Sequence, residues 1–143
     1  MNVRLALLTL FASLAFAGSA SAFGGADFTK TRYGVDYLAV HALIQVACPG
    51  GTQSTDRIGD FSLCTGYIEI TRGGRTIAYA PVALRTNDRI TQRVPVLKRS
   101  ARNYLRRHRS MGVQLKMVTH DGRGNFATNE RDATLYDDFH DVL

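Results

Sequence analysis

The densest group of residues able to do chemistry is a run of cations at 97–109, which reads LKRSARNYLRRHR. A helix turns 100° per residue, so a helix over this run would gather five cations on one arc. These candidate polyanion-binding residues are Lys98, Arg99, Arg102, Arg106 and Arg109. Ammonium and guanidinium groups at this spacing can meet successive phosphate or carboxylate groups. The pattern therefore predicts a polyanion site.

The same run also has an apolar arc, made of Leu97, Ala101, Tyr104, Leu105 and His108. A crossover helix that covers one end of a β-sandwich would bury this arc and turn its basic face to water. Solvation is the commoner role of such a face. A purely structural helix therefore stands as the alternative to a binding site.

Sequence patterns typical of catalysis and metal binding do not occur. Neither an HExxH nor a CxxC motif is found, no serine lies in a GxSxG elbow, and no glycine-rich phosphate loop precedes a helix. The histidines are scattered singly, at His41, His108, His120 and His140. We therefore expect no catalytic residue, no metal ligand and no cofactor.

Two acidic segments have simpler explanations than chemistry. Asp56 and Asp60 would form a glycosidase-like pair only if the fold spaced them beneath a sugar cleft. A polar loop between the two cysteines accounts for them. The 121–125 segment has one carboxylate where a Ca²⁺ loop has several, and its glycines suit a hairpin. We interpret it as a turn.

Cys48 and Cys64 are the two cysteines of the chain, so they allow one intramolecular pairing. A disulfide between them would close the loop 49–63 and stabilise the fold by about 3 kcal/mol in the chain-entropy model. A reactive cysteine would instead need an unpaired thiol and a neighbouring base. We predict the structural disulfide.

Residues 1–22 have the features of a secretory signal peptide. Arg4 supplies the positive charge, 5–17 form an apolar run, and the Ala-Ser-Ala at 20–22 is a small-residue cleavage site. As a helix this run would span about 20 Å, less than the bilayer core of about 30 Å. We expect a secreted, extracellular protein, with the bacterial cell envelope as another address, and no membrane span after cleavage.

The positive charge of the expected mature chain is local. The whole chain has 18 Lys and Arg against 12 Asp and Glu, a formal net charge of +6, and removal of Arg4 with the leader gives +5. Six of the remaining cations lie in 98–109, which contains no acid. Without that segment the mature chain would be close to neutral, which favours a basic patch over a uniformly cationic protein.

The elements that would position this patch are mostly strands, because apolar residues alternate along 38–48, 64–70, 76–84, 90–97, 113–119 and 126–136. The Arg-Gly-Gly-Arg at 72–75 predicts a hairpin turn. Pro81 and Pro95 predict edge strands or bulges. We expect an all-β fold, an antiparallel sandwich of six or seven strands with one short basic crossover helix. It forms a single domain over 23–136, followed by an acidic C-terminal tail at 137–143.

Several of these segments resemble immunoglobulin-like β-sandwich domains of secreted bacterial proteins. The likeness is carried by VACP at 46–49, CTGYIEI at 64–70, VPVL and the basic run at 94–105, VQLK at 113–116 and DGRG at 121–124. The resemblance implies an immunoglobulin-like fold and an extracellular address. It implies no chemistry, since domains of this kind share none.

These observations favour a secreted, non-catalytic domain that binds anionic cell-envelope polymers or an extracellular partner through the basic helix. Nucleic acid is not an expected partner. The alternative is a small secreted peptidase inhibitor that presents the disulfide-constrained loop. That loop resembles one disulfide loop of bacterial subtilisin-type inhibitors, although the second cysteine pair is missing. The tail at 137–143 carries three aspartates and could compete with an external anion for the basic face.

Overall fold

The computed structural model describes residues 23–49, 57–58, 61–122 and 124–137. The expected signal peptide, most of the loop between the cysteines and all but Asp137 of the acidic tail lie outside these residues. In chain order the elements are β1 (Asp27–Phe28), β2 (Arg32–Gly34), the 3-10 turn η1 (Tyr37–Ala39), β3 (His41–Ala47), β4 (Arg57–Ile58), β5 (Phe61–Arg72), β6 (Arg75–Arg85), β7 (Arg89–Pro95), α1 (Arg99–His108), β8 (Ser110–His120) and β9 (Phe126–Tyr136).

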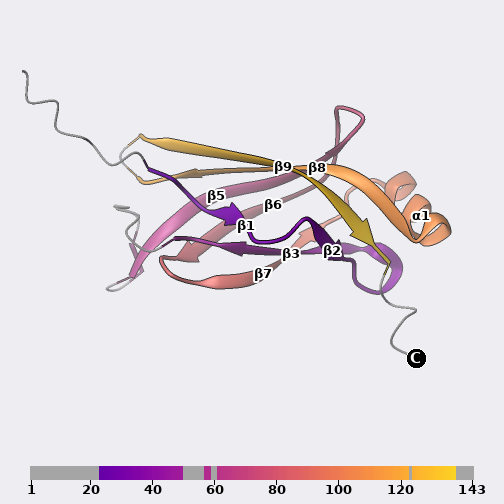
Figure 1. The fold of residues 1–143 in the computed structure, drawn as a ribbon, viewed down its shortest axis with the longest axis horizontal. Coiled ribbons are helices and arrows are strands. Elements are labelled where there is room, and N and C mark those ends of the chain that lie inside the picture. Colours follow the sequence, from indigo (N-terminus) through magenta and orange to yellow (C-terminus); the bar gives the residue numbers. More distant parts are fainter. Residues whose placement is uncertain (1–22, 50–56, 59–60, 123, 138–143) are drawn as a thin grey trace, which may run out of the picture.

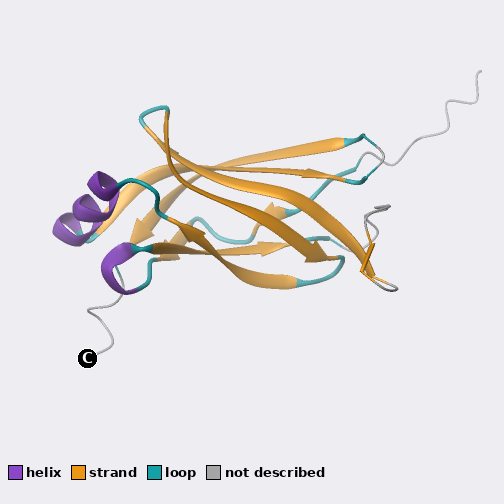
Figure 2. Ribbon diagram, turned by 180° about the vertical axis from the view of Figure 1, so that it is seen from behind, coloured by secondary structure: helices purple, strands orange, loops and turns teal. Residues whose placement is uncertain are grey.

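The strands form two sheets around one core. One sheet has the order β1-β3-β7, and the other follows β2-β9-β8-β5, with β4 and β6 also paired to β5. Backbone bridges connect the two sheets, from Ala78 on β6 to Val96 after β7 and from Val35 after β2 to Ala42 on β3. The strands thus curl into a half-barrel with α1 at one end, seen from opposite sides in Figures 1 and 2.

The expected all-β fold with one short basic helix is confirmed. The last strand has the expected bounds, Phe126–Tyr136. The described strands number nine where six or seven were expected, because β1, β2 and β4 have two or three residues each, too few to show alternation. β2 also pairs with β9 in parallel, whereas the other described ladders are antiparallel.

The strand expected from residue 38 begins at His41 instead, because residues 37–39 form η1. Leu38 and Ala39 have φ of 63° and 53°, in the left-handed region that strands avoid. The Asp36 carboxylate closes this turn by accepting the His41 backbone N–H at 2.7 Å. The side chain of Leu38 consequently faces solvent rather than the core.

From β3 onward, side chains alternate between core and solvent as the sequence predicts. Alternate residues of β3 are fully buried, and β8 buries one face from Met111 to Thr119. Pro81 lies on β6, whose ladder runs along β5 and whose outer side is bridged at Ala78, and Pro95 ends β7, the outer strand of its sheet. Both prolines therefore occupy edges, where a missing backbone N–H leaves no ladder bond unmade.

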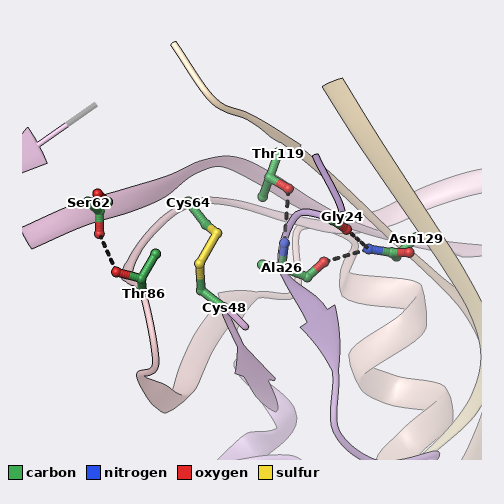
Figure 3. Close-up of a disulfide and its surroundings, with 8 residues drawn as sticks. All are labelled: Gly24, Ala26, Cys48, Ser62, Cys64, Thr86, Thr119 and Asn129. Carbon is green, nitrogen blue, oxygen red and sulfur yellow. Dashed lines mark hydrogen bonds between the residues drawn. A yellow bond between two sulfur atoms is a disulfide. The ribbon is translucent and has the colours of Figure 1, made fainter. Parts of the chain in front are cut away.

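Cys48 and Cys64 form the predicted disulfide, which joins the residue after β3 in one sheet to β5 in the other (Figure 3). Both residues are buried. The β6–β7 turn is bonded to the same place, since Cys48 N–H donates to the Asp88 carbonyl at 3.1 Å and Asn87 N–H donates to the Cys48 carbonyl at 2.8 Å. The bridge therefore fixes one end of the domain.

Candidate functional site

The candidate site begins with α1, whose ten residues cross from β7 in one sheet to β8 in the other. The helix packs on η1 and β8, with Ala101 and Leu105 buried and Tyr104 half-buried. This part of the expected apolar arc is confirmed. Leu97 departs from it, because it precedes the helix and is 58% exposed. His108 is exposed as well and stacks on Tyr104 with ring centroids 3.9 Å apart.

The five predicted polyanion-binding residues all lie on or at the ends of α1. Lys98 is the N-cap residue and Arg109 the C-cap residue, and both are exposed, as are Arg99 and Arg106. Arg102 is half-buried, and its Nε is buried without a hydrogen-bond partner in the described part of the chain. The helix therefore presents four of the five side chains to solvent and holds the fifth partly against the domain.

None of these five cations forms an ion pair with a carboxylate of the described residues. The ion pairs of that part of the chain are His41 and Arg93 with Asp36, and Arg131 with Asp27. The first turn of α1 has no acidic residue, and no side chain caps it. The partial positive charge of the helix N-terminus thus adds to the charges of Lys98 and Arg99.

The C-terminal turn of α1 gives its cations a structural role too. Arg106, Arg107 and His108 lie beside the negative end of the helix dipole, where positive charge stabilises a helix by about 0.3–1 kcal/mol. Arg109 adopts φ 65° and its N–H donates to the Leu105 carbonyl at 2.8 Å. Asp137 N–H donates to the Arg109 carbonyl at 2.9 Å, which places the start of the acidic tail beside the helix end.

A basic groove lies between the β5–β6 turn and the first turns of α1. Its volume is about 480 Å³, and its lining includes Arg72, Arg75, Ile77, Lys98, Ser100 and Tyr104. The Arg72 guanidinium lies 3.7 Å from the centroid of the Tyr104 ring. The residue types at 72–75 predict only a turn, and the turn is confirmed, with φ of 57° and 72° at its two glycines. Its two arginines line the same groove as Lys98, a tertiary arrangement for which the local sequence carries no signal.

A second polar cluster surrounds Asp36 and closes the η1 turn. Asp36 Oδ2 lies 2.7 Å from His41 Nδ1 and accepts a hydrogen bond from Arg93 at 2.7 Å. Burial raises the pKa of the Asp36 carboxyl, but hydrogen bonds from His41 and the charges of His41 and Arg93 outweigh burial and lower this pKa overall. Sequence reasoning missed this cluster because Arg93 is distant in the chain.

The pKa of the Tyr33 side chain is also shifted, and this residue has a packing role. Burial raises the pKa of its phenol, against the opposing effect of a backbone hydrogen bond at Lys30. The hydroxyl donates to the Lys30 carbonyl at 2.7 Å. This bond closes the segment between β1 and β2.

Of the remaining features considered in the sequence, some lie within the described residues and others lie outside them. The two ends of the 121–125 segment are bonded to each other, since the Asp121 carboxylate accepts bonds from Asn125 N–H at 3.2 Å and from its Nδ2 at 2.7 Å, while residue 123 lies outside the described residues. Across the described ranges, no three His, Cys, Asp or Glu side chains are grouped to hold a metal ion. Asp56, Asp60 and His140, with most of the proposed inhibitor loop, lie outside the described residues.

Comparison with family models, with curated proteins and with solved structures finds no match to this chain. In the described part of the chain, no helix has the length and apolar character needed to cross a membrane.

Proposed function

We propose that this protein is a secreted, non-catalytic β-domain that binds anionic polymers of the bacterial cell envelope through α1. The observation that carries the proposal is the group of cations at 98–109, none of which has a carboxylate partner among the described residues. Charges already paired within a domain are poor anchors for a ligand, because binding must first break the internal pair. Unpaired cations bear no such penalty.

The rigidity of α1 supports the same proposal. Ala101 and Leu105 are buried against the domain, so the backbone that carries the cations is held in place before any ligand arrives. Each cation that neutralises a polymer anion releases condensed counterions, and binding of this kind weakens steeply with salt. The proposed interaction is therefore strong at low ionic strength and weak at high ionic strength.

The extracellular address is part of the proposal. A buried disulfide suits an oxidising compartment, where such bonds form and persist. We also propose the immunoglobulin-like family for this fold. A bridge between two sheets supports that assignment, because immunoglobulin domains place their disulfide in the same way.

The experiment is salt-gradient retention on immobilised inorganic polyphosphate. The test variant carries Arg99→Gln, Arg102→Gln and Arg106→Gln. The matched control carries Lys30→Gln, Arg85→Gln and Arg89→Gln, which removes the same charge from exposed positions outside α1. Thermal unfolding of each variant establishes that it is folded.

The helix variant should elute at lower salt than the unmodified protein. The slope of log affinity against log salt should become shallower by about 2, because three contacts are lost and each contributes about 0.7 on a single-stranded polyanion. The control should elute close to the unmodified protein. Equal losses in both variants would mean that net charge alone governs retention and would refute the assignment to α1. Unchanged retention of the helix variant would refute it as well.

A further inference from the structure

The groove beside α1 differs from the outer face of the helix, because its cations come from two distant parts of the chain. Arg72 and Arg75 flank the β5–β6 turn, and Lys98 precedes α1. No acidic residue lines the groove, and the side chains of these three cations form no ion pair within the described part of the chain. Three positive charges therefore converge on one concave site.

Arg72 is held in place before any ligand binds. Its guanidinium lies over one face of Tyr104, whose ring in turn stacks on His108. Contact with an aromatic face restrains a guanidinium but leaves its in-plane N–H groups free to donate. Those donors match the oxygens of a phosphate, which an arginine can bind in a bidentate manner. Tyr104 is thus a positioning residue for Arg72.

The size and lining of the groove indicate more than an inorganic ion. Its volume of about 480 Å³ falls within the range of small-molecule sites, roughly 300–1,000 Å³. Beside the cations lie Ile77, Ala101 and the hydroxyl-bearing Ser100. This mixture suits a ligand that has a dianionic end and a short organic portion.

We propose that this groove binds the phosphate of a phosphorylated polyol or sugar, presented as a terminal or pendant unit of an envelope polymer. A phosphate monoester carries close to two negative charges and three acceptor oxygens at neutral pH, which fits three cations better than a carboxylate does. This inference rests on the proposed function and names the chemical group that the polymer would place beside α1.

Isothermal titration with glycerol 3-phosphate at low salt tests the site, with glycerol and acetate as the neutral and monoanionic controls. The unmodified protein should bind glycerol 3-phosphate and neither control compound. The variant with Arg72→Gln and Arg75→Gln should bind it at least about tenfold more weakly, since hydrogen bonds between charged groups are removed. The control variant at Lys30, Arg85 and Arg89 should bind as the unmodified protein does.

A positioning role for Tyr104 is tested by two substitutions. Tyr104→Phe keeps the aromatic face and should leave the affinity unchanged. Tyr104→Leu removes it and should weaken binding about two- to fivefold, the range of an exposed cation–π contact. Equal affinities of these two variants would overturn that role.

Chemical modification of the unmodified protein gives a test without any substitution. Glycerol 3-phosphate should protect Arg72 and Arg75 from phenylglyoxal, as read by mass spectrometry, and leave Arg89 reactive. Absence of binding, equal binding by the groove variant, or absence of protection would overturn the site. These failures are distinct from failure of the proposed function, which is read from polyphosphate retention of the helix variant.

Discussion

Removal of the disulfide should lower the stability of the protein by an amount that can be divided into two contributions. Cys48 and Cys64 are 16 residues apart, so the cross-link removes about 3 kcal/mol of chain entropy from the unfolded state. Both residues are buried, and the double substitution Cys48→Ala, Cys64→Ala also deletes two buried sulfur atoms. If each deletion costs about 1 kcal/mol, the variant loses roughly 5 kcal/mol in total.

The assay is equilibrium unfolding in guanidinium chloride, with and without a reductant. Reduction of the unmodified protein should lower its free energy of unfolding by about 3 kcal/mol, the chain-entropy contribution alone. The contribution from the deleted sulfur atoms does not arise, because those atoms remain in the core. In thermal unfolding this loss corresponds to a melting temperature lower by roughly 10–15 °C. The double alanine variant should be the less stable of the two and insensitive to reductant. A reduction cost below about 1 kcal/mol would refute the reasoning that the bridge stabilises the fold by constraining the unfolded chain.

Three further predictions concern a close approach, a pH dependence and the tail. Gly66→Ala should destabilise by about 2–3 kcal/mol in chemical unfolding, because its Cβ would overlap the Val118 carbonyl oxygen, whereas Gly112→Ala, with open space at its Cβ, should be near neutral. Asp36→Asn should cost about 1–2 kcal/mol at neutral pH and flatten the acid limb of the stability–pH curve. The folded-state pKa of Asp36 is lowered, so its stabilisation is present above the unfolded value of about 3.9 and is lost as pH falls through the folded value. Equal acid limbs would contradict this. Truncation after Tyr136 should tighten polyphosphate binding at low salt, because it removes three aspartates, the first of which, Asp137, is bonded to Arg109 at the end of α1. Unchanged affinity would argue against competition by the tail.

The strands were predictable because their period is local. In β9 and β8 each residue that faces the core is followed by one that faces outward. This period of two is visible in the sequence as an alternation of apolar and polar residues. The disulfide was predictable for a different reason, since two cysteines allow one pairing. Strands of two or three residues, such as β2, leave no such pattern. Their positions depend on partners elsewhere in the chain, which a local pattern does not reveal.

The η1 turn shows where local pattern misleads. Leu38 fits the alternation that continues into β3, yet its backbone is left-handed and its side chain is exposed. The competing interaction is the bond from His41 N–H to the Asp36 carboxylate, which favours a closed turn. Asp36 is further fixed by Arg93, on a strand that lies 57 positions later in the chain. A tertiary contact therefore helps to hold a conformation that local propensity disfavours.

The cations of α1 could be predicted from the sequence, whereas the groove beside the helix could not. The basic and apolar arcs of the helix follow from residue spacing, and so its cations were identified in the sequence. Predicting the groove would have required knowing that the β5–β6 turn lies close to α1. These two segments are separated in the chain by β6 and β7, so no local pattern reveals their proximity. From the sequence alone, Arg72 and Arg75 are residues that flank a hairpin turn. In the structure they add two positive charges at the end of the domain where α1 lies.

The most direct test of polyanion binding at this end of the domain is an NMR titration of the ¹⁵N-labelled protein with inorganic polyphosphate. We expect amide shifts in α1 and in the turn at Gly73 and Gly74, and we expect added salt to reverse them. Amides near Cys64 should not shift, because β5 separates them from that turn by about 26 Å. Shifts centred on the disulfide end, or no shifts at low salt, would contradict the account.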